Sequence, residues 1–216
     1  MIININENSM YFIRRPPTKI LSLESYLESG RITKERYDLL IEHIRKRSNI
    51  VIGGETGSGK TTLLNAVIDK IRELMPDDSF YVVEDIGEIQ CKARDCVLIL
   101  ASRKDCLKAV ATALRCNVSH IIFGEFRYDD ADDATYEVLK AWNLGYTGGI
   151  TTIHANCTQS MLSRIRDLLR EAIPGELPDV AQSVQLLVHM KRTKNGPVVS
   201  EVVETKQIRD IEEESF

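Results

Sequence analysis

The sequence predicts an α/β fold: a mostly parallel sheet with helices on both faces and a C-terminal β-hairpin. Three observations support this prediction. Short apolar runs alternate along the chain with segments in which apolar residues recur at helical spacing. A glycine-rich segment, residues 53–59, separates one such run from a helical segment. Two β-rich runs near the end of the chain are joined at Asn195-Gly196, a dipeptide typical of tight hairpin turns.

The first predicted elements are a helix, a strand and a second helix. Thr33 is a suitable N-cap for a helix whose apolar positions recur through Ile44 and whose last turn, residues 45–47, is basic. Residues 50–52 are an apolar run followed by glycines, which predicts a strand. Residues 60–75 carry apolar side chains at helical period. Strand, loop and helix therefore follow in the order that a phosphate-binding loop requires.

The remaining elements continue the alternation. Three further apolar runs predict strands that are buried on both faces of the sheet, at residues 80–83, 97–100 and 121–123. Helical periodicity predicts three more helices, at residues 105–114, 130–144 and 161–172. Another strand is expected at residues 148–153, and the β-rich segment 184–203 forms the predicted hairpin.

Length and composition predict one main domain. The chain has 216 residues, of which 43% are hydrophobic and 28% are charged, as is ordinary for a globular protein. Residues 23–216 are expected to form that domain. Residues 1–22, which contain Pro16-Pro17, are expected to be a linker, an edge strand or the remnant of an N-terminal domain. The five cysteines include no C-x-x-C pair, so buried free thiols are expected rather than a zinc site or disulfides.

Charge and hydropathy argue against two classes of protein. The net charge of -4 and a pI near 5.7 disfavour a domain that coats nucleic acid, and no direct sequence-specific nucleic-acid binding is expected. No apolar run approaches the roughly 20 residues that span a bilayer, and the N-terminus lacks the pattern of a signal peptide. The sequence therefore predicts a cytoplasmic protein.

Residues 54–61 match the phosphate-binding loop pattern G-x-x-x-x-G-K-[ST]. Glycines let successive backbone N–H groups point at phosphate oxygens, and the helix that begins near Lys60 directs its positive end at the same anion. Lys60 is expected to reach the β- and γ-phosphates of ATP, and the Thr61 hydroxyl to ligate Mg²⁺. The alternative is a glycine-rich turn with a solvated lysine. The predicted nucleotide-binding residues are Gly54, Glu55, Thr56, Gly57, Ser58, Gly59, Lys60, Thr61 and Thr62.

Hydrolysis of ATP also requires acidic groups that position water and the metal ion, and a group that meets the γ-phosphate. Glu84-Asp85 and Glu125 each follow an apolar strand, at the edge where ligands bind in open α/β sheets. His154 ends another β-rich run. Taken singly, a carboxylate at a strand end is often a solvated cap, and a histidine there is more often structural. Three arginines are candidates for neutralising charge on transferred phosphate, although arginines commonly form surface ion pairs: Arg103, Arg115 and Arg127.

Four ordered segments resemble those of the secretion ATPases that serve type II and type IV secretion, pilus assembly and conjugation. The resemblance is greatest to the conjugal-transfer branch, the TrbB and VirB11-like ATPases. The segments correspond to that family's Walker A, Asp box, Walker B and His box, at residues 53–64, 82–90, 121–127 and 148–156. The run Lys-Ala-Trp-Asn-Leu-Gly at 140–145 is a further similarity. One departure is Tyr128, where the family's Walker B segment usually has an aspartate.

The resemblance implies a RecA-like P-loop NTPase domain that assembles as a homo-oligomer, a hexameric ring, on the cytoplasmic face of a bacterial inner membrane. It implies Mg²⁺-dependent ATP hydrolysis and contact with inner-membrane secretion-channel or pilus components. By the same resemblance, Glu84 and Glu125 share the polarisation of water and the holding of Mg²⁺, with Glu125 favoured as the base. The implied catalytic residues are Lys60, Glu84, Glu125 and His154, and the implied metal ligands are Thr61 and Glu125.

Two classes of function stay open at this point. The first is an enzyme, an ATP phosphohydrolase that converts hydrolysis into subunit movement for the export of protein, pili or conjugative DNA. The second is a truncated nucleotide-binding assembly module with little turnover of its own. A motor that acts directly on DNA is a third interpretation, which the acidic pI disfavours.

Overall fold

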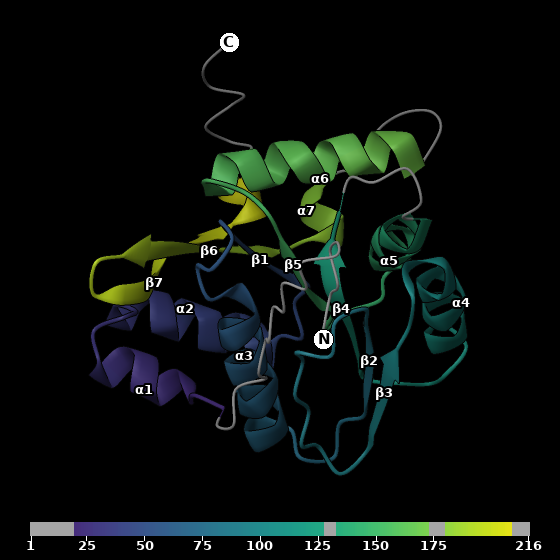
Figure 1. The fold of residues 1–216 in the computed structure, drawn as a ribbon, viewed down its shortest axis with the longest axis horizontal. Coiled ribbons are helices and arrows are strands. Elements are labelled where there is room, and N and C mark those ends of the chain that lie inside the picture. The colour runs from purple at the N-terminus through teal and green to yellow at the C-terminus, as the bar shows by residue number, and fades with distance from the viewer. Residues whose placement is uncertain (1–19, 128–132, 173–179, 209–216) are drawn as a thin grey trace, which may run out of the picture.

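The computed structural model of the chain describes residues 20–127, 133–172 and 180–208. Fourteen helices and strands lie within these ranges (Figure 1). In chain order they are α1 Leu23–Glu28, α2 Lys34–Arg45, β1 Ile50–Gly54, α3 Lys60–Leu74, β2 Phe80–Glu84, β3 Cys96–Leu100, α4 Arg103–Ala113, β4 His120–Phe126, α5 Asp133–Asn143, β5 Ile150–Ile153, α6 Thr158–Ala172, α7 Val180–Ser183, β6 Leu186–Thr193 and β7 Gly196–Glu204.

The strands form one seven-stranded sheet in the order β3-β2-β4-β5-β1-β6-β7. Every neighbouring pair is parallel except β6 and β7, which form an antiparallel hairpin. The hairpin turns between Thr193 and Gly196, as the Asn195-Gly196 signal predicts. The predicted α/β fold, with a mostly parallel sheet and a C-terminal hairpin, is confirmed.

Helices cover both faces of the sheet (Figure 1). One apolar core lies between the sheet and α1, α2 and α3, and the other lies between the sheet and α4, α5, α6 and α7. Successive side chains of a strand point to opposite faces, so Ile50 and Ile52 of β1 enter the first core while Val51 enters the second. This burial on both faces explains why the central strands read as continuous apolar runs.

Parallel pairing brings the carboxyl ends of the central strands to one edge of the sheet. At this edge β1 leads into the glycine-rich loop, β2 and β4 carry Glu84 and Glu125 near their carboxyl ends, and His154 directly follows β5. Residues far apart in the sequence, such as Lys60 and His154, which are 94 positions apart, thereby become neighbours.

The prediction that residues 97–100 are buried on both faces is wrong. β3 ends the sheet and pairs only with β2, while α3 packs over β1 and β5 and α4 over β2. The side chains of Val97, Leu98 and Leu100 are consequently 41%, 46% and 63% exposed. An apolar run does not distinguish an edge strand from a central strand, because the local sequence does not determine the order of the strands in the sheet.

The boundaries of the other predicted elements lie within about three residues of the observed ones, except that two short helices, α1 and α7, were not predicted. Most of the predicted linker 1–22 and the first residues of the predicted helix 130–144 lie outside the described residues. The expectation of buried thiols holds only for Cys106, because Cys116 lies in an exposed loop and the others are half-buried. No helix in the described ranges is both long and apolar enough to cross a bilayer.

Candidate functional site

The glycine-rich loop joins the buried strand β1 directly to α3. Gly59 is the N-cap of α3 and has a φ of +90°, a backbone conformation that favours glycine over residues with a Cβ. No side chain caps this end of α3. The N–H groups of the first turn and the positive end of the helix dipole are therefore available to an anion in the loop.

The Lys60 side chain folds back over the loop. Its ammonium group donates hydrogen bonds to the carbonyl oxygens of Gly54 and Glu55, at 3.0 and 3.2 Å, and lies 3.2 Å from Nδ1 of His154. The residue is only 8% exposed. A buried ammonium requires acceptors, and here the loop backbone supplies two of them and the end of β5 supplies a third.

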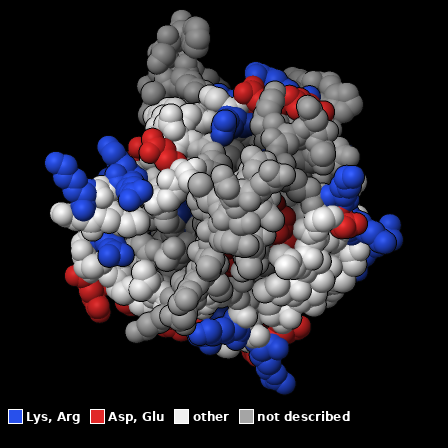
Figure 2. Space-filling model, viewed as in Figure 1, with Lys and Arg blue, Asp and Glu red and all other residues white. Residues whose placement is uncertain are grey.

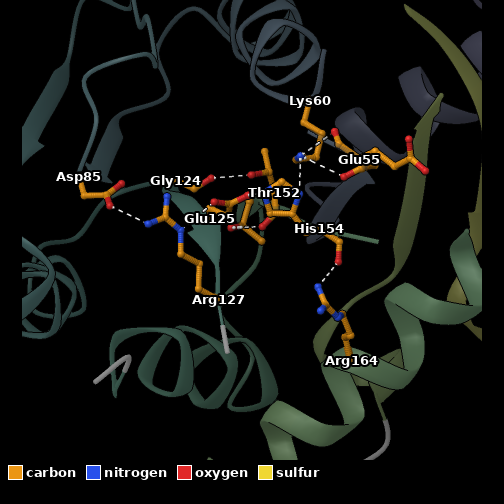
Figure 3. Close-up of polar contacts among 11 residues, drawn as sticks. Glu55, Lys60, Asp85, Gly124, Glu125, Arg127, Thr152, His154 and Arg164 are labelled. Atoms are coloured by element: carbon orange, nitrogen blue, oxygen red, sulfur yellow. Dashed lines mark hydrogen bonds and ion pairs between the residues drawn. The ribbon is translucent and has the colours of Figure 1, made fainter. Parts of the chain in front are cut away.

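Charged side chains continue from His154 across the edge of the sheet (Figure 3). His154 Nε2 lies 3.0 Å from Oε1 of Glu125. The other carboxylate oxygen of Glu125 accepts a hydrogen bond of 2.8 Å from Nε of Arg127, whose Nη1 lies 3.0 Å from Asp85. We call Lys60, His154, Glu125, Arg127 and Asp85 the charged chain. It links the glycine-rich loop to the end of β2.

Contacts with the backbone hold the side chains of the charged chain in place. β4 carries one extra residue against β5 between Ile122 and Glu125, a bulge of the kind that redirects a side chain at the end of a strand. The Thr152 hydroxyl donates to the Gly124 carbonyl at 2.9 Å. A guanidinium N–H of Arg164, on α6, donates to the carbonyl of His154 (Figure 3). The local irregularity of β4 and the tie to α6 thus fix the two central members of the chain.

Glu84 lies at the same edge but has different partners. Its carboxylate accepts hydrogen bonds from the backbone N–H of Glu88 at 2.8 Å and of Ile89 at 3.1 Å. The residue is 4% exposed. Burial is the largest influence on the carboxyl and raises its pKa, although the backbone donors oppose the shift. Glu84 therefore holds the segment after β2 in place.

These residues surround a cavity of about 480 Å³, a volume typical of a site for a small molecule. The loop and the start of α3 form one wall through Thr56, Gly57, Gly59, Lys60, Thr61 and Thr62. The ends of the neighbouring strands contribute Glu84, Asp85, Glu125, Arg127 and His154 to the lining. Three predicted loop residues do not line it, because Gly54 and Ser58 are buried and Glu55 points away (Figure 3).

Of the predicted arginines, the structure brings only Arg127 into this site. Arg115 is exposed and lies between α4 and the start of β4, at the amino-end edge of the sheet. Arg103 begins α4, and its side chain lies outside the described part of the chain. Sequence reasoning missed Asn65, which lines the cavity and accepts a hydrogen bond from the N–H of Gln90 at 2.9 Å.

A signal for Asn65 exists in the sequence, because it lies four residues after Thr61 and thus on the same face of α3. The sequence analysis also did not identify Pro197, which lines the cavity from β7. No local signal could place Pro197 here, because its position depends on where the hairpin packs.

The residues at this site fit a nucleoside triphosphate with Mg²⁺. The uncapped helix end, the loop and the Lys60 ammonium suit phosphate oxygens. No group of three or more His, Cys, Asp or Glu side chains within the described ranges is arranged to hold a metal ion. Mg²⁺ in nucleotide sites usually has one or two protein ligands and takes the rest from phosphates and water, which suits Thr61 and Glu125, because both line the cavity.

Comparison with known proteins gives the family. Residues 9–209 match the family model described as "Type II/IV secretion system protein". The conjugal transfer protein TrbB of Rhizobium radiobacter is 38% identical to this chain over 202 residues, which are 93% of this chain and 61% of TrbB. The type IV secretion system protein VirB11 of Bartonella quintana is 26% identical over 202 residues, 86% of this chain and 54% of VirB11.

The fold has the same relatives. The crystal structure of the VirB11 ATPase from the Brucella suis type IV secretion system, in complex with sulphate, superimposes with a TM-score of 0.66 at 22% identity, over 92% of this chain and 67% of that chain. This chain spans about three fifths of the length of the curated TrbB that it matches. Because the family model covers nearly all of the sequence, the chain belongs to the type II/IV secretion system protein family.

Proposed function

We propose that this chain is a Mg²⁺-dependent ATPase that powers type IV secretion, conjugation or pilus assembly. The observation that carries the proposal is the charged chain, which joins the Lys60 ammonium of a phosphate-binding loop to the Glu125 carboxylate through His154. Phosphoryl transfer to water depends on a cation for the phosphates and a group that orients the water. The two kinds of group line the same cavity.

Each residue has a role in this proposal. Lys60 exchanges the carbonyl oxygens of Gly54 and Glu55 for the β- and γ-phosphates, and Thr61 with Glu125 holds Mg²⁺. The metal ion, when bound, neutralises charge that develops on the phosphates. Glu125 orients the attacking water and takes its proton, while His154 leaves Lys60 to contact the γ-phosphate region. Glu84 is the weaker candidate for the base, because its oxygens accept backbone N–H groups, whereas the partners of Glu125 are side chains that can move away.

The proposal extends to the machine that the ATPase serves. TrbB is a conjugal transfer protein and VirB11 a type IV secretion system protein, which supports a role in export across the envelope. We propose that the protein acts as a homo-oligomer, a hexameric ring, in the cytoplasm at the inner membrane, in contact with secretion-channel or pilus components. The family membership supports this arrangement.

One observation favours the second candidate, a nucleotide-binding assembly module with little turnover. Glu125 is held between two side-chain partners, Arg127 and His154. A base in such pairing is poorly available to water until at least one partner moves. If no event releases it, the chain binds ATP without hydrolysing it.

Phosphate release from Mg²⁺-ATP, measured against protein concentration, tests the proposal. The variants are Lys60→Ala and Glu125→Gln, and the matched control is Lys34→Ala, because Lys34 is also the first residue of a helix but pairs with Asp38 at an exposed site. We expect specific activity to rise with concentration and both site variants to lose it, with the control unchanged. ATP binding without turnover above the Lys60→Ala background would establish the assembly module instead.

A further inference from the structure

The strand β6 continues past the phosphate-binding loop. β1 and β6 pair in parallel up to Gly54 and Met190, where β1 turns into the loop. β6 runs on for three more residues, Lys191, Arg192 and Thr193, before the hairpin turn. The end of this strand is therefore the flank of the loop.

Alternation along β6 decides which of these side chains faces the loop. Val188 and Met190 enter the core on the α3 side of the sheet, so Arg192 points to the same side and Lys191 to the other. A Cβ placed on Gly57 would lie 3.7 Å from Nη1 of Arg192. The guanidinium therefore lies beside the loop at Gly57.

The strand that pairs with β6 at Arg192 is β7, and one of its residues lines the cavity. Pro197 of β7 pairs with Arg192 in the hairpin ladder. It lines the cavity, and its Cβ would lie 3.1 Å from a Cβ placed on Gly59. The hairpin thus contributes Pro197 to the lining of the cavity, and Arg192 lies next to that residue, beside the loop and outside the lining itself.

The charge of Arg192 is not neutralised by its surroundings. It is exposed, and no residue of the described ranges forms a hydrogen bond or ion pair with it. Glu55, the carboxylate of the loop, does not pair with it, and the neighbouring Lys191 and Lys194 are also exposed cations. Figure 2 shows Lys and Arg side chains on the side of the molecule where Figure 1 places the β6–β7 hairpin.

We propose that Arg192 is a further phosphate-binding residue of this site, which holds the phosphate chain of a nucleoside triphosphate from the hairpin side of the loop. A guanidinium presents planar, paired N–H donors that match phosphate oxygens. The inference rests on the proposed function, because it requires that a triphosphate occupies the Lys60 loop. It assigns a role to the hairpin, which lies outside the four motif segments.

Binding of ATP, ADP, AMP and adenosine by calorimetry tests this role in Arg192→Ala, Arg192→Lys and the matched control Lys191→Ala. Lys191 is the adjacent exposed cation on the other side of the strand. We expect Arg192→Ala to weaken ATP binding about tenfold, the size of one lost charge-assisted hydrogen bond. Arg192→Lys should recover part of the loss. AMP and adenosine binding should change less, and Lys191→Ala should stay within about twofold for ATP.

Three results would overturn the inference. Equal ATP affinities for Arg192→Ala and Lys191→Ala would show that Arg192 is only a surface cation, while the proposed function would stand. An equal loss for ATP and adenosine would place the guanidinium on the base or ribose rather than on phosphate. Failure of the unmodified chain to bind ATP at all would overturn the proposed function and this inference together.

Discussion

Two networks that each contain a histidine, a carboxylate and an arginine occupy opposite edges of the sheet. At the carboxyl-end edge, His154 pairs with Glu125, and at the amino-end edge His120 Nε2 lies 2.8 Å from Asp78, which also pairs with Arg47 at 2.6 Å. The imidazole of His120 is 1% exposed and that of His154 is 43% exposed. The pairs are chemically alike, and their surroundings differ.

The difference teaches that enclosure, rather than residue type, separates a structural pair from a reactive one. His120 has all its partners within the protein: Nδ1 lies 2.9 Å from the Gly148 carbonyl and the ring stacks on Phe80 with centroids 4.9 Å apart. His154 lines a cavity that is open to a ligand. A buried pair with every polar atom satisfied resists change, whereas a pair beside a cavity can exchange partners.

The largest expected effect is on stability, where the two histidines should differ most. His120→Ala should lower the free energy of unfolding by about 3 kcal/mol, because it leaves a cavity beside Phe80 and removes a partner from the buried Asp78 carboxylate. Urea unfolding measures the change. His154→Ala removes the same ring from a half-exposed site and should cost no more than about 0.5 kcal/mol. Equal losses of unfolding free energy for the two variants would show that burial does not determine how much each histidine contributes to stability.

For ATP turnover we expect the opposite order, with substitution of His154 having a larger effect than substitution of His120. His154→Ala should lower turnover about a hundredfold, the usual size for loss of one positioned polar group in an active site. The physical reason is that His154 contacts both Lys60 and Glu125. Phosphate release under saturating Mg²⁺-ATP measures it, with His120→Gln, assayed where it is folded, as the matched control. Full turnover by His154→Ala would remove His154 from the proposed mechanism.

Much of this arrangement could be predicted from sequence because it is local or follows from parallel pairing. The segment from Ile50 to Leu74 is a strand, a glycine-rich loop and a helix in immediate succession, and each part has its own signal. Since the carboxyl ends of parallel strands share an edge, the meeting of Glu84, Glu125 and His154 also followed from the predicted fold.

The rest could not be predicted, because it depends on distances between remote segments. Nothing in the pattern around Glu84 shows that its carboxylate accepts backbone N–H groups four and five residues later. The exposure of β3 depends on the order of the strands. The position of Arg192 depends on how many residues β6 extends beyond its pairing with β1. That number is known only when the register of the two strands is known.

Glu84 sharpens the comparison, because it lies at the open edge yet is enclosed like His120. Glu84→Ala should lower the free energy of unfolding by about 2 kcal/mol, since the N–H groups of Glu88 and Ile89 lose their acceptor. Urea unfolding is the measurement, and Asp85→Asn, next in the chain and 26% exposed, is the control with a smaller loss. A loss below about 0.5 kcal/mol would mean that water replaces the carboxylate without cost.

The smallest expected effect is the pH dependence that enclosure gives to Glu84. Burial raises the pKa of this carboxyl above its ordinary value of 4.5, so the folded protein holds this proton at a pH where the unfolded chain has lost it. Its contribution to stability is therefore full below about pH 4.5 and declines as pH rises through the raised pKa. Deprotonation leaves a charge in a site that is 4% exposed.

Comparison with Glu84→Gln isolates this contribution, because all other titrating groups are shared by the two proteins. The stability advantage of the unmodified chain over Glu84→Gln should shrink as the pH of the urea titrations rises from 4 to 8. An advantage that grows with pH would mean that the backbone donors of Glu88 and Ile89 outweigh burial. In that case Glu84 is a carboxylate stabilised by its backbone donors, which makes it a still weaker proton acceptor beside Glu125.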